Sequence, residues 1–252
     1  MTSVVETIES LVAADRAFAH VIVVGGPDLG ASAVIADGEV VAGAVGIDLD
    51  ELAQDVAVLV ARGQSATLSY GPHDVFVDAI TPRPDLVVFG AFHVAEVLSA
   101  LAARVGFRVV VADPRPAFAE ADRFPDADEV RTGWPDELVP ELGIGANSYV
   151  VSLLHDDRHE AALLPAVLAT AAPYIGALGS RKTHARRVAN LREQGVADEE
   201  IERISGPVGL DIGAATPEEV ALAILAEAVA VRRGGGAADL IGRVKRIGEA
   251  AG

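Results

Sequence analysis

The first third of the chain has apolar side chains at two kinds of spacing. Residues 2–16 and 48–62 carry them at helical intervals. Short apolar runs that are typical of strands lie at residues 20–24, 33–35, 39–45, 66–70 and 75–80. Between the second and third run, Asp37-Gly38 predicts the turn of a hairpin. These patterns predict a small α+β domain over residues 1–80.

A stiff joint follows this region. Residues 81–84 are Thr-Pro-Arg-Pro, and prolines this close together favour extended chain. We therefore expect a domain boundary here.

From residue 85 the pattern changes to strands that alternate with helices. The predicted strands are residues 85–89, 107–112, 149–154 and 174–178, and the clearest helices are 94–104 and 216–231. Thr216 and Glu219 form the N-cap and N3 positions of a capping box, with Pro217 at N1. This alternation predicts an α/β fold with a Rossmann-like parallel sheet over residues 85–231. Residues 232–252 are predicted to be a flexible amphipathic tail.

Composition narrows the classes of function. The 252 residues carry 20 Lys and Arg against 37 Asp and Glu, which gives a formal net charge of −17. Such a surface repels nucleic acid and anionic membrane, so neither is an expected partner. No uncharged apolar run reaches the roughly 18 residues of a membrane helix. The absence of cysteine excludes disulfides, thiolate metal sites and a cysteine nucleophile. No secretory signal is recognisable, and we expect a cytoplasmic protein.

The first candidate site is the turn that begins at Gly90. It follows a predicted strand, opens a helix and precedes Asp113 at the end of the next strand, as in dinucleotide-binding folds. In that fingerprint the second glycine lets the backbone approach a pyrophosphate, and here Phe92 stands in its place. NAD(P) binding is therefore disfavoured. His93 either caps or packs the helix, or points into the crevice at the carboxyl ends of the strands.

Two further candidates also follow predicted strands. Asp113 could bind a ribose hydroxyl and Arg115 a phosphate, or the two could form a solvated ion pair in a proline-stiffened loop. His155 and His159 would share a helix face as metal ligands, whereas Asp156 or Asp157 is a natural N-cap. We favour a site without metal, in which His155 and Asp156 line a ligand pocket.

The most informative stretch begins with Gly179, Ser180, Arg181 and Lys182. It follows a predicted strand and opens a helix, where free N–H groups and the helix dipole favour an anion. Basic side chains in the first turn oppose that dipole, and such a conflict points to function. The alternative is a solvated helix face. We predict that a phosphate binds here.

Seven motifs follow one another along the second region. They are Gly90-Ala91-x-His93-Val94-Ala95, Asp113-Pro114-Arg115, Arg123-Phe124-Pro125-Asp126-Ala127, His155-Asp156, Tyr174-Ile175-Gly176-x-x-Gly179-Ser180-Arg181, Gly206-Pro207-x-Gly209-Leu210-Asp211-Ile212-Gly213 and Thr216-Pro217-Glu218-Glu219. In this order they resemble the XdhC/CoxI family of xanthine dehydrogenase accessory proteins. The resemblance implies a C-terminal Rossmann domain that binds molybdenum cofactor, supports its sulfuration and delivers it to a molybdenum hydroxylase.

Two departures from the family pattern indicate a divergent member. Phe92 replaces the second glycine of the family's Gly-Ala-Gly-His turn. Residues 46–50 lack the glycine pair and the cysteine of the family's Ser-Gly-Gly-Cys segment. Any function that needs that cysteine is put in doubt.

The leading hypothesis is a non-catalytic chaperone that carries molybdenum cofactor as cargo. Its expected pocket contains His93, Asp113, Arg115, His155 and the Ser180 helix start. A separate cysteine desulfurase would supply sulfur, and a homodimer is expected on general grounds. One alternative is an NAD(P)-dependent oxidoreductase, which Phe92 and the lack of a Tyr-x-x-x-Lys pair disfavour. The other is a degenerate family member that binds only protein. Fold does not decide among them.

Overall fold

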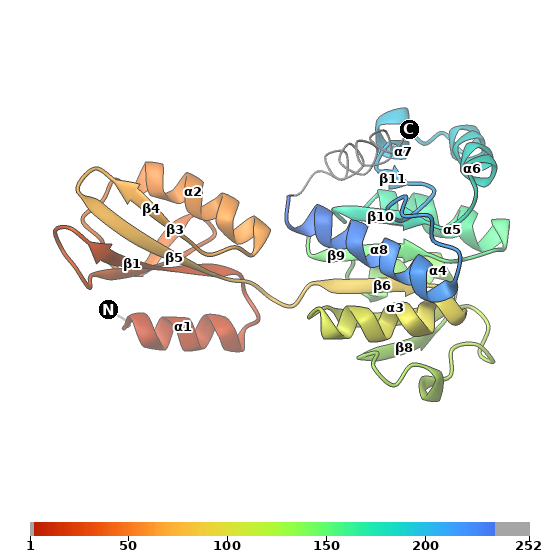
Figure 1. Cartoon of the computed structure of the whole chain (residues 1–252), viewed down its shortest axis with the longest axis horizontal. Coiled ribbons are helices and arrows are strands. Elements are labelled where there is room, and N and C mark those ends of the chain that lie inside the picture. Colours follow the sequence, from red (N-terminus) through yellow and green to blue (C-terminus); the bar gives the residue numbers. More distant parts are fainter. Residues whose placement is uncertain (1–2, 235–252) are drawn as a thin grey trace, which may run out of the picture. The chain divides into compact units, whose positions relative to one another are not determined.

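The structure is a computed structural model that describes residues 3–234, and it consists of two compact units, Met1–Pro82 and Arg83–Gly252 (Figure 1). The units divide inside the Thr-Pro-Arg-Pro segment. Residues 235–252, which include most of the predicted tail, lie outside the described residues. None of the helices in the described part of the chain is long and apolar enough to cross a bilayer.

The first unit contains a five-stranded antiparallel sheet in the order β3-β2-β1-β5-β4. Its elements are α1 (Val4–Ala13), β1 (Phe18–Gly25), β2 (Ser32–Ala36), β3 (Glu39–Gly43), α2 (Leu49–Arg62), β4 (Ala66–Tyr70) and β5 (His73–Ile80). Successive side chains of a strand point to opposite faces, so Ile35 packs in the cluster that contains Leu52 of α2, and Val34 packs with Leu11 of α1. The third strand ends at Gly43, two residues before its predicted end.

The second unit contains a six-stranded parallel sheet in the order β11-β10-β9-β6-β7-β8. Its strands are β6 (Asp85–Phe89), β7 (Arg108–Asp113), β8 (Glu129–Thr132), β9 (Ser148–Ser152), β10 (Tyr174–Ala177) and β11 (Ile204–Ser205). The chain runs outward from β6 to one edge, then returns to β9 and runs to the other edge. This is the doubly wound Rossmann order, and its topological switch point lies between β6 and β9. The predicted α/β fold class is confirmed.

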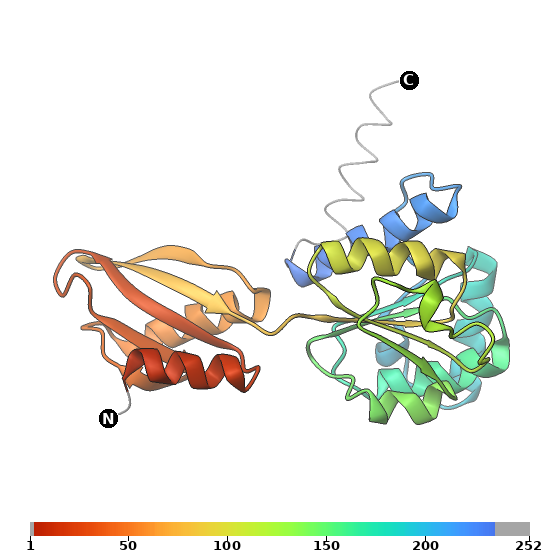
Figure 2. The same cartoon turned by 90° about the horizontal axis from the view of Figure 1, so that it is seen from below.

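Helices cover both faces of this sheet (Figure 2). They are α3 (His93–Arg104), α4 (Pro135–Glu141), α5 (Asp157–Leu168), α6 (Arg181–Glu193), α7 (Asp198–Ile201) and α8 (Pro217–Arg232), and a 3₁₀ turn lies at Ala121–Arg123. Leu98 of α3 and Ile224 of α8 pack in one buried cluster, whereas Leu163 of α5 and Leu191 of α6 pack in the other. Thr216 and Glu219 make the predicted capping box at the start of α8.

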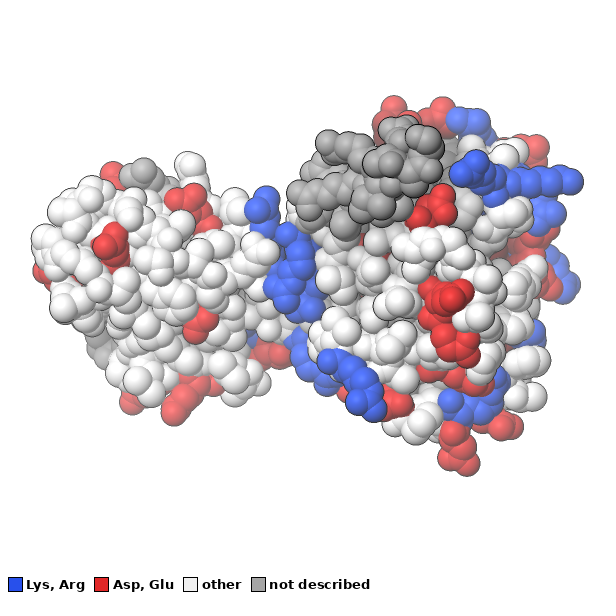
Figure 3. Space-filling model, viewed as in Figure 1, with Lys and Arg blue, Asp and Glu red and all other residues white. Residues whose placement is uncertain are grey.

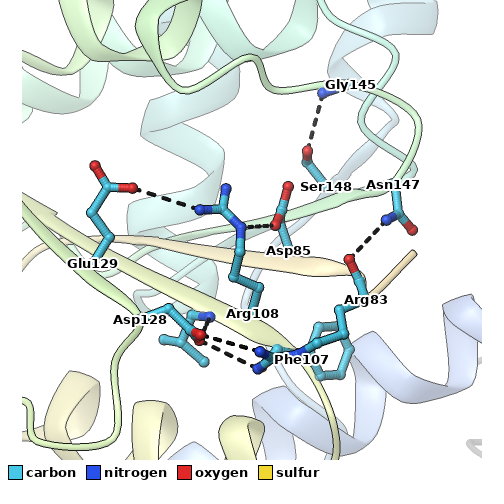
Figure 4. Close-up of polar contacts among 10 residues, drawn as sticks. Arg83, Asp85, Phe107, Arg108, Asp128, Glu129, Gly145, Asn147 and Ser148 are labelled. Atoms are coloured by element: carbon cyan, nitrogen blue, oxygen red, sulfur yellow. Dashed lines mark hydrogen bonds and ion pairs between the residues drawn. The ribbon is translucent and has the colours of Figure 1, made fainter. Parts of the chain in front are cut away.

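Ion pairs connect the amino ends of the strands (Figure 4). Arg108 pairs with Asp85 at 2.6 Å and with Glu129 at 3.6 Å, so the starts of β6, β7 and β8 are joined. Arg83 pairs with Asp128 at 3.1 Å and donates to the carbonyl oxygen of Phe107 at 2.6 Å. This edge of the sheet is therefore occupied by structural polar contacts, and the candidate site lies at the opposite edge.

Candidate functional site

A cavity lies among the turns that follow β6, β7 and β9, at the carboxyl edge of the sheet. It has an empty volume of about 550 Å³, its open mouth included, and we call it the switch-point cavity. Its lining residues are Phe92, Arg115, Leu154, His155, Asp156 and His159. Doubly wound folds bind ligands at such a switch point. Four residues that the sequence singles out, Phe92, Arg115, His155 and Asp156, are thus brought together.

The Gly90 turn is fixed by close packing against the end of β9. Gly90 has a φ of +109°, and a Cβ atom there would lie 2.9 Å from the carbonyl carbon of Leu153. Its N–H donates to the carbonyl oxygen of Ala112 at 2.7 Å. Only glycine allows both this conformation and this approach. The turn therefore holds three neighbouring strand ends together beside the cavity.

Asp113 is completely buried and serves as an anchor. Its carboxylate accepts hydrogen bonds from the N–H of Ala91 at 2.9 Å and from the N–H, Nε and Nη2 of Arg115 at 2.8–2.9 Å. Burial by itself would raise the pKa of Asp113, but these hydrogen bonds outweigh it and lower the pKa below its ordinary value. The structure thus corrects the expectation that Asp113 meets a ribose hydroxyl, because its acceptors already serve the turn and Arg115.

Arg115 is the cation that the cavity presents. Its guanidinium carbon lies 4.0 Å from the ring centre of Phe118 and 4.8 Å from that of Phe92, so the group contacts two aromatic rings, whose own centres lie 6.0 Å apart. The hydrogen bond to Asp113, followed by the charge of that carboxylate, raises the pKa of Arg115. Within the part of the chain that the structure describes, Nη1 of Arg115 has no hydrogen-bond partner. A fixed donor with a positive charge therefore remains for a ligand.

Phe92 lines the cavity beside Arg115. It is the N-cap residue of α3 and provides no side-chain hydrogen bond to the first turn of that helix. Its ring meets that of His155 edge-on, with 4.6 Å between the ring centres. The phenyl group stands where the second glycine of the dinucleotide fingerprint leaves room for a pyrophosphate.

The segment after β9 begins α5. Asp156 is its N-cap and accepts from the N–H of Arg158 at 2.9 Å, as one of the two interpretations of this residue predicts. The hydrogen bond from the Arg158 side chain, and then that from its N–H, lower the pKa of Asp156 to about 2. His155 precedes the N-cap, so His155 and His159 do not share a helical face. No cluster of three His, Asp or Glu side chains among the described residues could hold a metal ion.

His93 does not point into the cavity, which corrects one interpretation of this residue. Its Nδ1 lies 3.0 Å from Oε2 of Glu96, and its Nε2 lies 3.6 Å from Oε1 of Glu218 at the start of α8. The hydrogen bond with Glu96 is the main reason that the pKa of His93 is raised. The ring thus joins the first turns of α3 and α8.

The basic segment after β10 begins with the N-cap of α6 and carries exposed basic side chains outside the cavity. Ser180 caps α6 by accepting from the N–H of Thr183 at 3.1 Å, and Gly179 precedes it with a φ of +144°. Lys and Arg side chains gather over α6, at the upper right of Figure 3. Arg181 and Lys182 are exposed and do not line the switch-point cavity. A phosphate at this helix start stays a prediction.

Sequence reasoning missed two ring-bearing contributors to the site, Phe118 and Trp134, and considered a third, His159, only as a metal ligand. Phe118 stacks on Arg115, His159 lines the cavity, and Trp134 meets the ring of His159 with 4.9 Å between ring centres. Of the two that were missed, only Trp134 carried a signal, because it is the one tryptophan of the chain.

Comparisons with known proteins agree with this architecture. A family model described as the XdhC Rossmann domain matches residues 86–228. A probable xanthine dehydrogenase subunit of Bacillus subtilis (strain 168) is 32% identical over 160 residues, which are 64% of this chain and 46% of that protein. The molybdenum cofactor insertion chaperone PaoD of Escherichia coli (strain K12) is 29% identical over 188 residues, 75% of this chain and 51% of PaoD.

The similarity to one solved structure extends beyond the domain that contains the parallel sheet. The crystal structure of a xanthine dehydrogenase from Bacillus halodurans matches with a TM-score of 0.68 and 26% identity, over 91% of this chain and 63% of that one. The chain spans about half the length of the two curated relatives named above.

Proposed function

The chain belongs to the XdhC family, and on this premise we propose that it is an accessory protein that binds molybdenum cofactor as cargo for a xanthine dehydrogenase-type molybdenum hydroxylase. The observation that carries the proposal is the switch-point cavity, in which Arg115 is held by a buried carboxylate and by two aromatic rings. The printed name of the relative PaoD supports it.

The cavity offers complementary groups for a phosphate-bearing pterin. The phosphate would accept from Nη1 of Arg115 and from first-turn N–H groups of α3, which lacks a side-chain cap. The flat pterin would lie against the rings of Phe92 and His155. A rival position for the phosphate is the start of α6, beside Arg181 and Lys182.

Sulfuration and assembly complete the proposal. The chain has no cysteine, so a cysteine desulfurase partner would supply any sulfur that the cofactor receives. We place this accessory role in the cytoplasm and in a homodimer, which is the commonest symmetric assembly.

The first test replaces Arg115. We expect Arg115→Gln to weaken binding of isolated molybdenum cofactor about 10- to 100-fold, the equivalent of roughly 1.5–3 kcal/mol for a lost charged hydrogen bond. Arg115→Lys keeps a charge near Asp113 but loses the planar fork, and should give an intermediate loss. Affinity is measured by calorimetry, and circular dichroism checks that each variant folds.

Two matched variants locate the phosphate. Arg192→Gln removes the same charge from an exposed ion pair with Asp198 on α7 and should leave cofactor affinity unchanged. The double variant Arg181→Ala/Lys182→Ala tests the rival position. If the double variant loses affinity while Arg115→Gln retains it, the phosphate binds at α6 and our placement is wrong.

The second test concerns the oxidoreductase alternative. We expect the parent chain to bind NAD weakly, with a Kd above about 1 mM, because the Phe92 ring fills the pyrophosphate position. Phe92→Gly should bind NAD more tightly, whereas Phe92→Leu, which keeps the bulk, should not. Calorimetric titration of all three proteins measures this. Micromolar NAD binding by the parent would favour an oxidoreductase instead.

A further inference from the structure

Trp134 is placed unusually for a large aromatic residue. The residue is 49% exposed, and it is the only aromatic one among the large hydrophobic residues that are exposed in the described part of the chain. The main chain of Trp134 begins α4, where its carbonyl oxygen accepts from the N–H of Leu138 at 3.0 Å. The indole itself contributes no hydrogen bond to the N-terminus of that helix. The backbone of Trp134 therefore takes part in the hydrogen bonds of helix α4, whereas its ring does not.

The indole is paired with a residue of the switch-point cavity. Trp134 follows β8 and Gly133, so it lies at the same carboxyl edge of the sheet as the cavity. Its ring meets that of His159 at an angle of 63°, with 4.9 Å between the centres, and His159 lines the cavity. The imidazole of His159 thus lines the cavity and also contacts the indole of Trp134.

We propose that Trp134 and His159 form an aromatic subsite at the rim of the switch-point cavity, which takes a flat heteroaromatic ring of the bound ligand. The inference rests on the proposed function, since the ring is taken to belong to the cofactor. Aromatic side chains bind such rings by stacking, and they tolerate different rings because each has a π-face. The subsite adds a second aromatic wall to that of Phe92 and His155.

A contact with a protein partner is the competing explanation for an exposed tryptophan. Partner surfaces place aromatic anchors in apolar patches. The ring of Trp134 instead contacts an imidazole, and that imidazole lines a cavity with the charged residues Arg115 and Asp156. This arrangement favours a small polar ligand with a flat ring.

The experiment compares three probes on the full chain. They are pterin-6-carboxylate and cytidine monophosphate, which represent the two kinds of flat ring, and ribose 5-phosphate, which has none. We expect Trp134→Leu to weaken binding of one or both flat-ring probes about tenfold and Trp134→Phe to stay within about threefold of the parent. Ribose 5-phosphate should bind all three proteins equally. Calorimetry gives the affinities, because Trp134→Leu removes the only tryptophan.

The parent protein provides an independent readout. Quenching of its single tryptophan by the flat-ring probes, corrected with free N-acetyltryptophanamide, is expected, and ribose 5-phosphate should cause none. Equal affinity of the parent and Trp134→Leu for every flat-ring probe, or no binding of these probes to the parent, would overturn the subsite and leave the indole for protein contacts.

The same variants separate this inference from the proposed function. If isolated molybdenum cofactor binds the parent, and Trp134→Leu changes neither that affinity nor the affinity for any flat-ring probe, the subsite is wrong and the proposed function stands. If cytidine monophosphate binds through Trp134 but molybdenum cofactor does not bind, the subsite stands and the proposed function is wrong.

Discussion

Replacing Glu160 with Ala is expected to lower the free energy of unfolding of the second unit by about 3–5 kcal/mol, because it leaves a buried charge without its partner. The side chain of Arg187 is only 2% exposed, and its Nη2 lies 2.8 Å from Oε1 of Glu160. Its Nε is already buried without a hydrogen-bond partner. Without Glu160, the guanidinium of Arg187 would keep only its contacts with the carbonyl oxygen of Leu178, at 2.8 Å, and with Nδ1 of His184, at 3.3 Å.

An exposed ion pair between the same two helices provides the control. Asp157 of α5 pairs with Arg186 of α6 at 2.8 Å, and both side chains are more than half exposed. Asp157→Ala should therefore cost less than about 1 kcal/mol. Chemical denaturation followed by the fluorescence of Trp134 measures the second unit, since that residue is the only tryptophan. Similar losses for Glu160→Ala and Asp157→Ala would show that the buried pair contributes no more than a surface pair.

The buried ion pair between Glu160 and Arg187 also lies next to segments that carry candidate site residues. Glu160 follows the cavity residue His159 directly in α5, and Arg187 holds the carbonyl oxygen of Leu178, the last residue before Gly179. Arg187 of α6 thereby joins α5 to the end of β10. Two of the basic residues in the segment after β10, Arg186 and Arg187, are engaged with acidic residues of α5, whereas Arg181 and Lys182 at the start of the helix are exposed.

Strand-end reasoning predicted much of the candidate site. In a parallel sheet the carboxyl ends of all strands lie at one edge, so residues that follow apolar runs must gather there. Phe92, Arg115, His155 and Asp156 follow three such runs, and the structure places all four around one cavity. The strand order that creates the switch point was not predictable from these runs, because apolar spacing carries no information about which strands are neighbours.

Side-chain direction could not be predicted in the same way. His93 and Phe92 are adjacent, yet Phe92 lines the cavity while His93 contacts Glu218, more than a hundred residues further along the chain. Asp113 was expected to face a ligand and is instead buried, because the Gly90 turn and Arg115 use its oxygens. Such contacts depend on tertiary packing, which residue types and spacing do not specify.

Short elements at the side of the sheet were missed for a related reason. Strand β8 has four residues, Glu129–Thr132, and none is fully buried, so it has no apolar run. Helix α4 has seven residues, Pro140 among them, and is too short for helical periodicity to show. Trp134 lies between these two elements, and it could not be assigned to the edge of the cavity without them.

Gly90→Ala is expected to lower the free energy of unfolding of the second unit by about 3–5 kcal/mol, because a methyl group there meets two penalties. A φ of +109° is strained for any residue with a side chain, at roughly 1–3 kcal/mol. The new Cβ would also lie 2.9 Å from the carbonyl carbon of Leu153 and 3.1 Å from its oxygen. The clash can be relieved only by moving the Gly90 turn away from the end of β9, where the switch-point cavity lies.

Gly106→Ala separates the two penalties. Gly106 has a similar φ of +93°, but a Cβ there would meet no atom within 4 Å, so its cost should be about 1–2 kcal/mol from strain alone. Denaturation of both variants measures the difference, and calorimetry with molybdenum cofactor asks whether the cavity survives. Because the Gly90 turn forms one wall of the cavity, Gly90→Ala should lose cofactor affinity even where it remains folded, whereas Gly106→Ala should keep it. Equal stability of the two variants would mean that the approach of Leu153 to Gly90 relaxes without cost.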